Sequence, residues 1–213
     1  MAKIHQGILG AFAGTIGPVT AYIRNGQNIL RPSTSIVKYE RTALRAVQLE
    51  KIRICNRFTK AFSGTGFFNK SFPAYGHAGS GYNRATSALL SQALTGVYPD
   101  LALNYSQTLI SKGRLPGARN AKATLKPKSI IQFSFADNST DGIAAAEDTV
   151  ILVAYARDLQ QAVFTLYGGF RKDTKASLNV VAFKAHAVET WIGFLSKDEK
   201  DASDSVWAGT VMV

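Results

Sequence analysis

The chain has 213 residues, of which 46% are hydrophobic and 18% charged, and its formal net charge is +11. This composition is typical of a globular protein and excludes a disordered chain. The sequence has no run of about 18 apolar residues that would indicate a membrane span. The single cysteine, Cys55, excludes an intrachain disulfide.

The positive charge is concentrated in the first part of the chain. Residues 1–128 hold 18 Lys and Arg against three Asp and Glu, whereas residues 129–213 hold 7 against 11. A strongly basic region followed by a mildly acidic one indicates two regions that face different partners. The candidate partners of the basic region are nucleic acid, an acidic protein surface, and the acidic region of a neighbouring copy.

Residues 1–31 are punctuated by glycine, and the apolar run at the start is too short and too interrupted for a signal peptide. We therefore expect the protein to be made in the cytoplasm. Asn25-Gly26 separates two apolar runs, and this dipeptide favours a two-residue β-hairpin because both turn positions need a positive φ. Residues 33–39 are expected to form an extended connector.

Residues 41–62 are predicted to form one long amphipathic helix. At 100° per residue, an apolar stripe covers about one third of the circumference and consists of Leu44, Val47, Ile54, Cys55, Phe58 and Phe62. The opposite side is basic and carries Arg41, Arg45, Arg53, Arg57 and Lys60. Such a face is either solvated or contacts an anionic partner, protein or nucleic acid. Of these two alternatives, we predict that the basic side is a contact surface. If the partner is another copy of the chain, its acidic turns at residues 137–141 and 197–204 are candidate acceptors.

The loop over residues 62–82 is rich in glycine and aromatic residues, unlike a free linker, which is polar. Its aromatic side chains need a cover, supplied by the chain's own domain or by a partner. We expect an oligomer contact here, made by Phe67, Phe68, Phe72 and Tyr75. A second helix is predicted at residues 83–95.

From residue 101 onward the hydrophobic period changes to two, which is typical of strands. Strands are predicted at residues 101–111, 121–126, 129–136, 149–157, 162–170, 174–184, 188–196 and 204–212. The last seven suggest an antiparallel immunoglobulin/fibronectin-like β-sandwich. The predicted fold class is therefore α+β, with a basic hairpin and amphipathic helices over residues 1–118 and the β-sandwich domain over residues 119–213.

No motif for catalysis or cofactor binding is present. Residues 64–71 hold Lys70-Ser71, but Asn69 replaces the glycine that a phosphate loop needs. The three histidines are isolated from other metal ligands, and there is no G-x-S-x-G nucleophile motif. We expect no catalytic, cofactor-binding or metal-binding residues, no small-molecule substrate, and no enzymatic activity.

Three stretches of the sequence form recognisable motifs. The opening MAKIHQGILGAFAGTIG fits MAKIxQGxLGxFxG, residues 93–118 fit TGxYPxxxxxYSxxLxSxGxLPGA, and residues 190–209 end in SDSxxAG. In these motifs the chain resembles a domain-of-unknown-function family of bacterial and phage proteins. The resemblance implies no activity. The glycine-rich start, the hairpin, Arg31-Pro32 and the basic helix with Gln48 are similar to the start of many phage structural proteins, which implies a virion or assembly component.

The sequence therefore favours a non-enzymatic structural protein that forms homo-oligomers and contacts other assembly proteins. The resemblance implies that the protein is incorporated in a phage virion, as a head, tail or spike component. The alternative is a nucleic-acid-binding or packaging protein that uses the basic helix 41–62.

Overall fold

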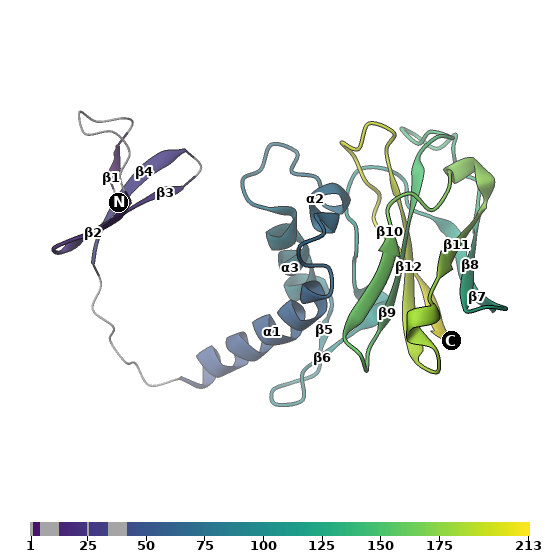
Figure 1. The fold of residues 1–213 in the computed structure, drawn as a ribbon, viewed down its shortest axis with the longest axis horizontal. Coiled ribbons are helices and arrows are strands. Elements are labelled where there is room, and N and C mark those ends of the chain that lie inside the picture. Colours follow the sequence, from purple (N-terminus) through teal and green to yellow (C-terminus); the bar gives the residue numbers. More distant parts are fainter. Residues whose placement is uncertain (1, 5–12, 25, 34–41) are drawn as a thin grey trace. The chain divides into compact units, whose positions relative to one another are not determined.

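The computed structural model describes residues 2–4, 13–24, 26–33 and 42–213 (Figure 1). The chain forms two compact units, Met1–Thr42 and Ala43–Val213. Three sequence expectations fall outside the described residues. They are most of the glycine-rich start, all of the connector except Ser33, and Arg41.

The N-terminal unit is a small antiparallel sheet. Its strands are β1 (Ala2–Ile4), β2 (Gly14–Ile16), β3 (Val19–Arg24) and β4 (Gln27–Pro32), in the order β1-β4-β3-β2. Arg24 pairs with Gln27, so β3 and β4 form the predicted hairpin with a two-residue connection. Of its described residues, three are buried: Ala21, Asn28 and Ile29. The described part of this unit, residues 2–4, 13–24, 26–33 and 42, therefore holds few core side chains.

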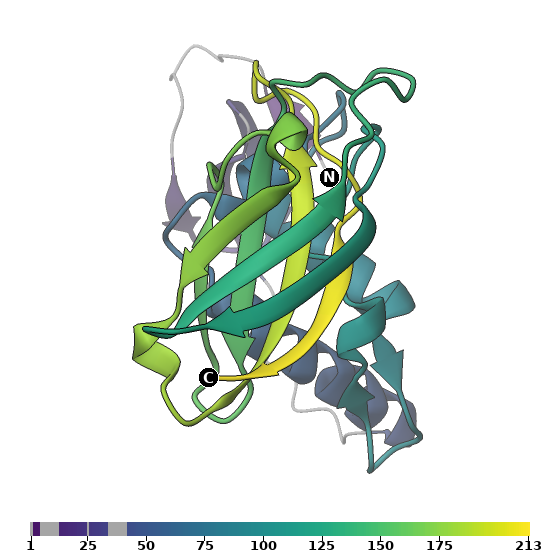
Figure 2. The same cartoon turned by 90° about the vertical axis from the view of Figure 1, so that its right-hand side faces the viewer.

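The second unit contains an antiparallel β-sandwich, which confirms the predicted fold class. One sheet has the order β10-β9-β12-β13 and the other β11-β8-β7. The strands are β7 (Arg119–Lys126), β8 (Ile130–Ala136), β9 (Thr149–Ala156), β10 (Gln161–Thr165), β11 (Lys175–Asn179), β12 (Ala187–Leu195) and β13 (Val206–Met212). Figure 2 looks onto the three-stranded sheet, with the four-stranded sheet behind it. Each of these seven strands lies within a few residues of a predicted strand. The prediction holds because alternate residues of the strands are apolar and face a shared core.

The central strands of the larger sheet are buried on both faces. In β9, the even-numbered residues 150–156 belong to the core between the sheets, whereas the odd-numbered residues 151–155 belong to a second core. Every residue of β12 after Ala187 is buried. A strand with two apolar faces needs a cover on the outer side of its sheet.

Three helices supply that cover: α1 (Ala43–Lys60), α2 (Phe67–Ser71) and α3 (Gly81–Gln92). Figure 2 shows them behind the sandwich. Phe58 of α1 lies at the centre, with its ring centroid 4.9 Å from that of Tyr155 and 5.9 Å from that of Trp191. A Cβ at Gly81 would overlap the Phe68 carbonyl, so α3 approaches α2 closely only because this residue is glycine.

The shared core places the domain boundary elsewhere than expected. A division at residues 118 and 119 would separate Phe58 from Tyr155 and Trp191, whereas the observed compact unit runs from Ala43 to Val213. The reason is that residues 119–213 leave the outer face of the larger sheet bare. The helices complete this face.

Two local predictions were wrong. Residues 101–111 do not form one strand. The segment instead holds β6 (Ala102–Leu103), which pairs with β5 (Leu94–Thr95), and the 3-10 turn η1 (Tyr105–Gln107). The Asn104 side chain accepts a hydrogen bond from the Ser106 amide at 3.1 Å, which favours the turn over an extended strand. The short helix α2 was not predicted, since it lies in the glycine-rich loop.

Candidate functional site

The predicted basic face lies on α1, and three of its members gather at one groove. Arg53, Arg57 and Lys60 line this groove together with Asn56 and Ala61, and residues 159–161 of the β9–β10 turn form its other side. Its volume is about 580 Å³. Arg45 is exposed on the same helix but does not line the groove. We call these lining residues the basic groove.

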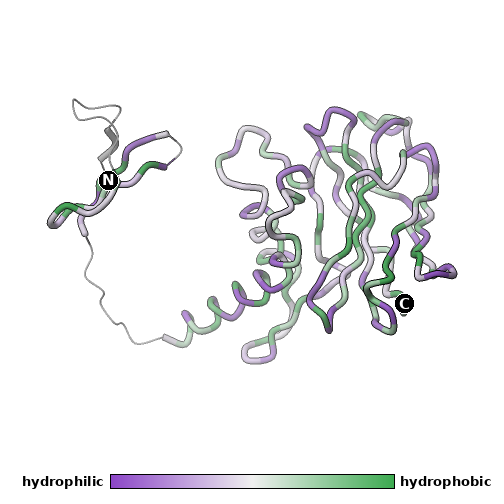
Figure 3. The backbone as a smooth tube through the Cα atoms, viewed as in Figure 1, coloured by the Kyte–Doolittle hydropathy of each residue, from purple (hydrophilic) through white to green (hydrophobic). Residues whose placement is uncertain are grey.

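Apolar side chains are exposed beside these cations. Leu44 is 81% exposed, Leu49 44% and Ile52 41%. Figure 3 shows hydrophobic and hydrophilic residues alternating along this part of α1. In Figure 1 the helix extends beyond the sandwich here, and its first buried residue is Cys55. Leu49 and Ile52 were not predicted as contact residues, although at 100° per residue both fall among the basic residues rather than on the apolar stripe.

The predicted aromatic contact surface is not a surface. Phe67, Phe68 and Phe72 are buried in the second core, with the Phe67 ring centroid 4.6 Å from that of Phe164. The chain's own sandwich therefore covers these three side chains, and they are not available as an oligomer contact. Tyr75 is 39% exposed.

One of the two acidic turns predicted as acceptors for a second copy, residues 197–204, is engaged within the chain. Glu199 pairs with Lys70 at 2.8 Å, and hydrogen bonds from Lys70 and Tyr167 lower the pKa of Glu199. Asp201 pairs with Arg114 at 2.9 Å and accepts a hydrogen bond from Tyr75. Burial raises the pKa of Asp201, but the bonds from Tyr75 and the Arg114 amide outweigh burial and lower it overall. This turn ties the helical layer to the sandwich.

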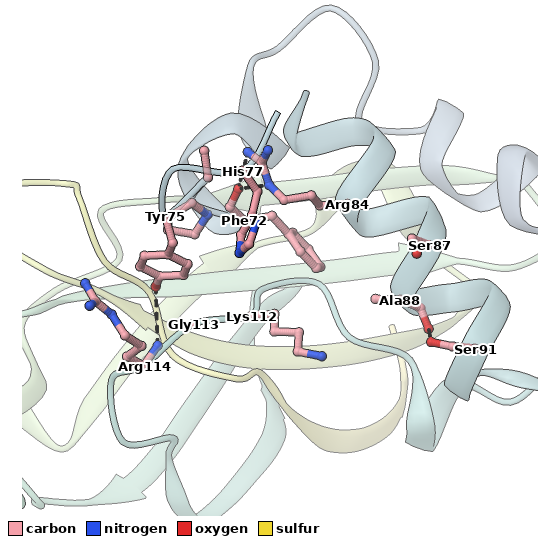
Figure 4. A pocket seen from close by; sticks show the side chains of 12 residues that line it. Phe72, Tyr75, His77, Arg84, Ser87, Ala88, Ser91, Lys112, Gly113 and Arg114 are labelled. Atoms are coloured by element: carbon pink, nitrogen blue, oxygen red, sulfur yellow. Dashed lines mark hydrogen bonds between the residues drawn. The ribbon is translucent and has the colours of Figure 1, made fainter. Parts of the chain in front are cut away.

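A depression of about 390 Å³ lies between residues 72–77, α3 and residues 112–114. Figure 4 shows the side chains that line it. Two of its cations hold the loops in place. Arg84 donates from Nε and Nη2 to the Phe72 carbonyl oxygen at 2.9 and 2.7 Å, and Arg114 is bound to Asp201. Lys112 makes no side-chain hydrogen bond within the described part of the chain. The depression contains no hydrogen-bonded pair of a nucleophile and a base.

Two of the motifs that carry the family resemblance, residues 93–118 and residues 190–209, pack against each other. The Ser205 hydroxyl oxygen accepts the Ile110 amide at 2.9 Å, and the Asp204 carboxylate accepts the Gly113 amide at 3.1 Å. A Cβ at Gly113 would overlap the Ala202 carbonyl, so this close approach requires glycine. These motif residues therefore act as structural anchors, and their polar atoms are used within the chain.

Three other features of the sequence have structural roles. Lys70 of the phosphate-loop-like segment is bound to Tyr167 and Glu199 rather than free for a phosphate. Burial raises the pKa of Cys55 to about 11, so the thiol is protonated and unreactive at neutral pH. Within residues 2–4, 13–24, 26–33 and 42–213, no three His, Cys, Asp or Glu side chains gather as metal ligands. In the same ranges no helix has the length and apolar character needed to cross a membrane.

Comparisons with known proteins identify a family but no activity. No curated protein matches the chain. Among solved structures, the chain is similar to the fn3 domain of human collagen alpha-1(XX) chain, with 12% identity and a TM-score of 0.34. The alignment covers 48% of this chain and 88% of that one. A family model described as "Family of unknown function (DUF6266)" matches residues 11–209. The chain therefore belongs to this family of unknown function.

Proposed function

We propose that this protein is a non-enzymatic assembly protein that associates head to tail, with the exposed part of α1 docking on the sandwich of the next copy. The observation that supports it is the pair Leu49 and Ile52, exposed among the cations of α1. A merely solvated helix face carries polar residues between its charges. Apolar side chains surrounded by arginine are instead typical of the centre of a protein interface.

Charge balance favours the sandwich as the second surface. The α1 helix carries five Lys and Arg against Glu50, whereas the sandwich, residues 119–213, carries 11 Lys and Arg against 11 Asp and Glu and therefore repels α1 less than another α1 would. A contact between two different surfaces of one chain repeats from copy to copy and builds rings or filaments. Such assemblies are what a head, tail or spike of a phage particle requires, which is the setting that the sequence resemblance suggests. Contacts with other assembly proteins would extend the same surface.

The basic groove supports a second candidate, nucleic-acid binding. Three cations surround it, and the side-chain amides of Asn56, Gln160 and Gln161 supply uncharged donors. Lys and Arg neutralise phosphates, and amides add hydrogen bonds without sequence preference. Leu49 and Ile52 have no role in this alternative.

Two multiple substitutions separate the candidates. Leu49→Gln with Ile52→Gln removes the apolar pair, and Arg53→Gln with Arg57→Gln and Lys60→Gln removes the groove cations. Glutamine preserves the helix in both. Sedimentation velocity of the parent should show oligomers whose size rises with concentration, and the apolar double variant should shift to monomer. A charge-matched control for the groove variant is Lys122→Gln, Lys126→Gln and Lys184→Gln, which lies outside the basic groove and should bind DNA like the parent.

Nucleic-acid binding is measured with a labelled DNA duplex by fluorescence anisotropy. Three phosphate contacts predict an affinity loss of about 40-fold when salt rises from about 50 to 200 mM. Binding with this salt dependence, lost in the groove triple variant and retained in the apolar double variant, would favour the second candidate. A parent that stays monomeric at high concentration in moderate salt contradicts head-to-tail assembly.

A further inference from the structure

A second depression, distinct from the basic groove, lies where the β5–β6 hairpin and η1 meet the four-stranded sheet. Its volume is about 570 Å³, within the range of small-ligand sites. Residues far apart in the sequence line it, including Asn104, Tyr105, Arg157, Glu189 and Trp207. Strands and their ends carry most of these side chains, which makes the site more rigid than a loop site.

Glu189 organises this depression. Its side chain is fully buried, and its two carboxylate oxygens accept hydrogen bonds from three partners. These are Arg157, the Trp207 indole at 2.7 Å and the Thr210 hydroxyl at 2.9 Å. The Arg157 guanidinium also lies over the Tyr105 ring, 4.5 Å from its centroid. The two aromatic rings and the guanidinium are therefore held in fixed positions before any ligand arrives.

The electrostatics of the depression favour an uncharged ligand. Arg157 and Glu189 are the only charged residues among those that line it, and they neutralise each other. An anion would find no unpaired cation here, and a metal ion or organic cation would find no free carboxylate, because the oxygens of Glu189 are already bonded. The ligand must gain its binding energy from apolar contact and neutral hydrogen bonds.

Groups for both kinds of contact face the depression. Trp207 is 36% exposed and offers aromatic surface, whereas the Arg157 guanidinium covers the Tyr105 ring. The hydroxyls of Thr95 and Tyr105 and the Asn104 amide nitrogen make no hydrogen bond to the described residues, so they remain able to bond a ligand. Arg157, with a half-exposed side chain, has five N–H donors, and a carboxylate does not use them all.

We propose that this depression binds a neutral saccharide ring. A pyranose presents C–H groups on one face, which pack on aromatic rings, and hydroxyls on its edge, which bond amides, hydroxyls and guanidinium. A purely apolar ligand would leave the polar groups of Asn104, Thr95 and Arg157 without partners, at a cost in affinity. This inference does not depend on the proposed assembly function.

The test uses the fact that the chain has two tryptophans. The full-length protein should show two indole N–H signals in a proton–nitrogen correlation spectrum, one from buried Trp191 and one from Trp207. Glucose, galactose, mannose, N-acetylglucosamine and rhamnose are titrated separately. At least one should shift the Trp207 signal saturably, while the Trp191 signal moves less. Glycerol serves as a polyol without a ring, and inorganic phosphate serves as a charged probe. Neither should shift the Trp207 signal.

Two variants of the same hairpin complete the test. Ala102→Tyr fills the depression without removing any member of the Glu189 network, and it should abolish the sugar-dependent shift. Val97→Tyr places the same side chain on an 82% exposed position that does not line the depression, and it should bind like the parent. The proposal is overturned if no sugar shifts Trp207 at about 50 mM, which is fifty times a weak Kd of 1 mM. It is equally overturned if Ala102→Tyr binds unchanged.

Discussion

Replacing Phe58 by alanine should destabilise the whole of residues 43–213, and not the helices alone. The Phe58 side chain is 2% exposed, and its ring lies 4.9 Å from Tyr155, 5.5 Å from Phe62 and 5.9 Å from Trp191, centroid to centroid. A core Phe→Ala substitution costs about 3–5 kcal/mol, through lost burial and the cavity that remains. We expect a loss of about 4 kcal/mol, a large fraction of the stability of a domain this size.

Urea unfolding measures this loss. With a slope of about 2 kcal/mol/M, the midpoint should fall by about 2 M. Tryptophan fluorescence and far-ultraviolet circular dichroism should give the same midpoint in the parent and in the variant, because one core joins helices and sandwich. Leu44→Ala, on the same helix at an exposed position, is the control and should change stability by less than about 0.5 kcal/mol. Helical signal lost first, with the sheet midpoint unchanged, would refute the single shared core.

Three further outcomes follow from the same contacts. The isolated fragment 119–213 should give a poorly dispersed amide spectrum and aggregate, because the outer face of its larger sheet is bare; a sharp, dispersed spectrum of a monomer would show that the helices are dispensable. Arg171→Leu should cost about 3–5 kcal/mol in urea unfolding, since it leaves buried Asp148, 3.1 Å away, without its cation. The double variant with Asp148→Leu should recover part of that cost, and a loss below about 1 kcal/mol in the single variant would contradict the mechanism. The pKa of Asp201 is lowered by folding, so its stabilising effect is complete above the usual carboxyl pKa of about 4 and disappears as the pH falls through the lowered value. Asp201→Asn should therefore flatten the acid limb of stability against pH, and an unchanged limb would exclude this carboxylate as its source.

The site residues divide according to how they could be found. The cations of α1 follow from helical periodicity, and three of the predicted five line the basic groove. The partners on its other side, residues 159–161, lie about 100 residues later, and no local pattern connects the two segments. The saccharide site is assembled in the same way, since Tyr105, Arg157 and Trp207 meet only when the sandwich has closed.

The sequence by itself determined the seven strands of the sandwich and the first hairpin. A period of two marks residues that face a common core, and Asn25-Gly26 fixes a tight connection, so both can be derived from neighbours along the chain. It also determined that residues 41–62 are helical with a basic side. The continuous apolar run of β9 is typical of a strand buried on both faces, a signal that the prediction of a strand at residues 149–157 did not use.

Only the tertiary structure decided what covers each apolar surface. The sequence of Phe67, Phe68 and Phe72 fits an exposed contact and a core equally well. Their burial depends on the sandwich that packs against them. The same holds for α1, whose first buried side chain is Cys55, because the helix extends beyond the sandwich before this residue (Figure 1). Periodicity records which side of an element is apolar, whereas burial depends on contacts between residues distant in sequence.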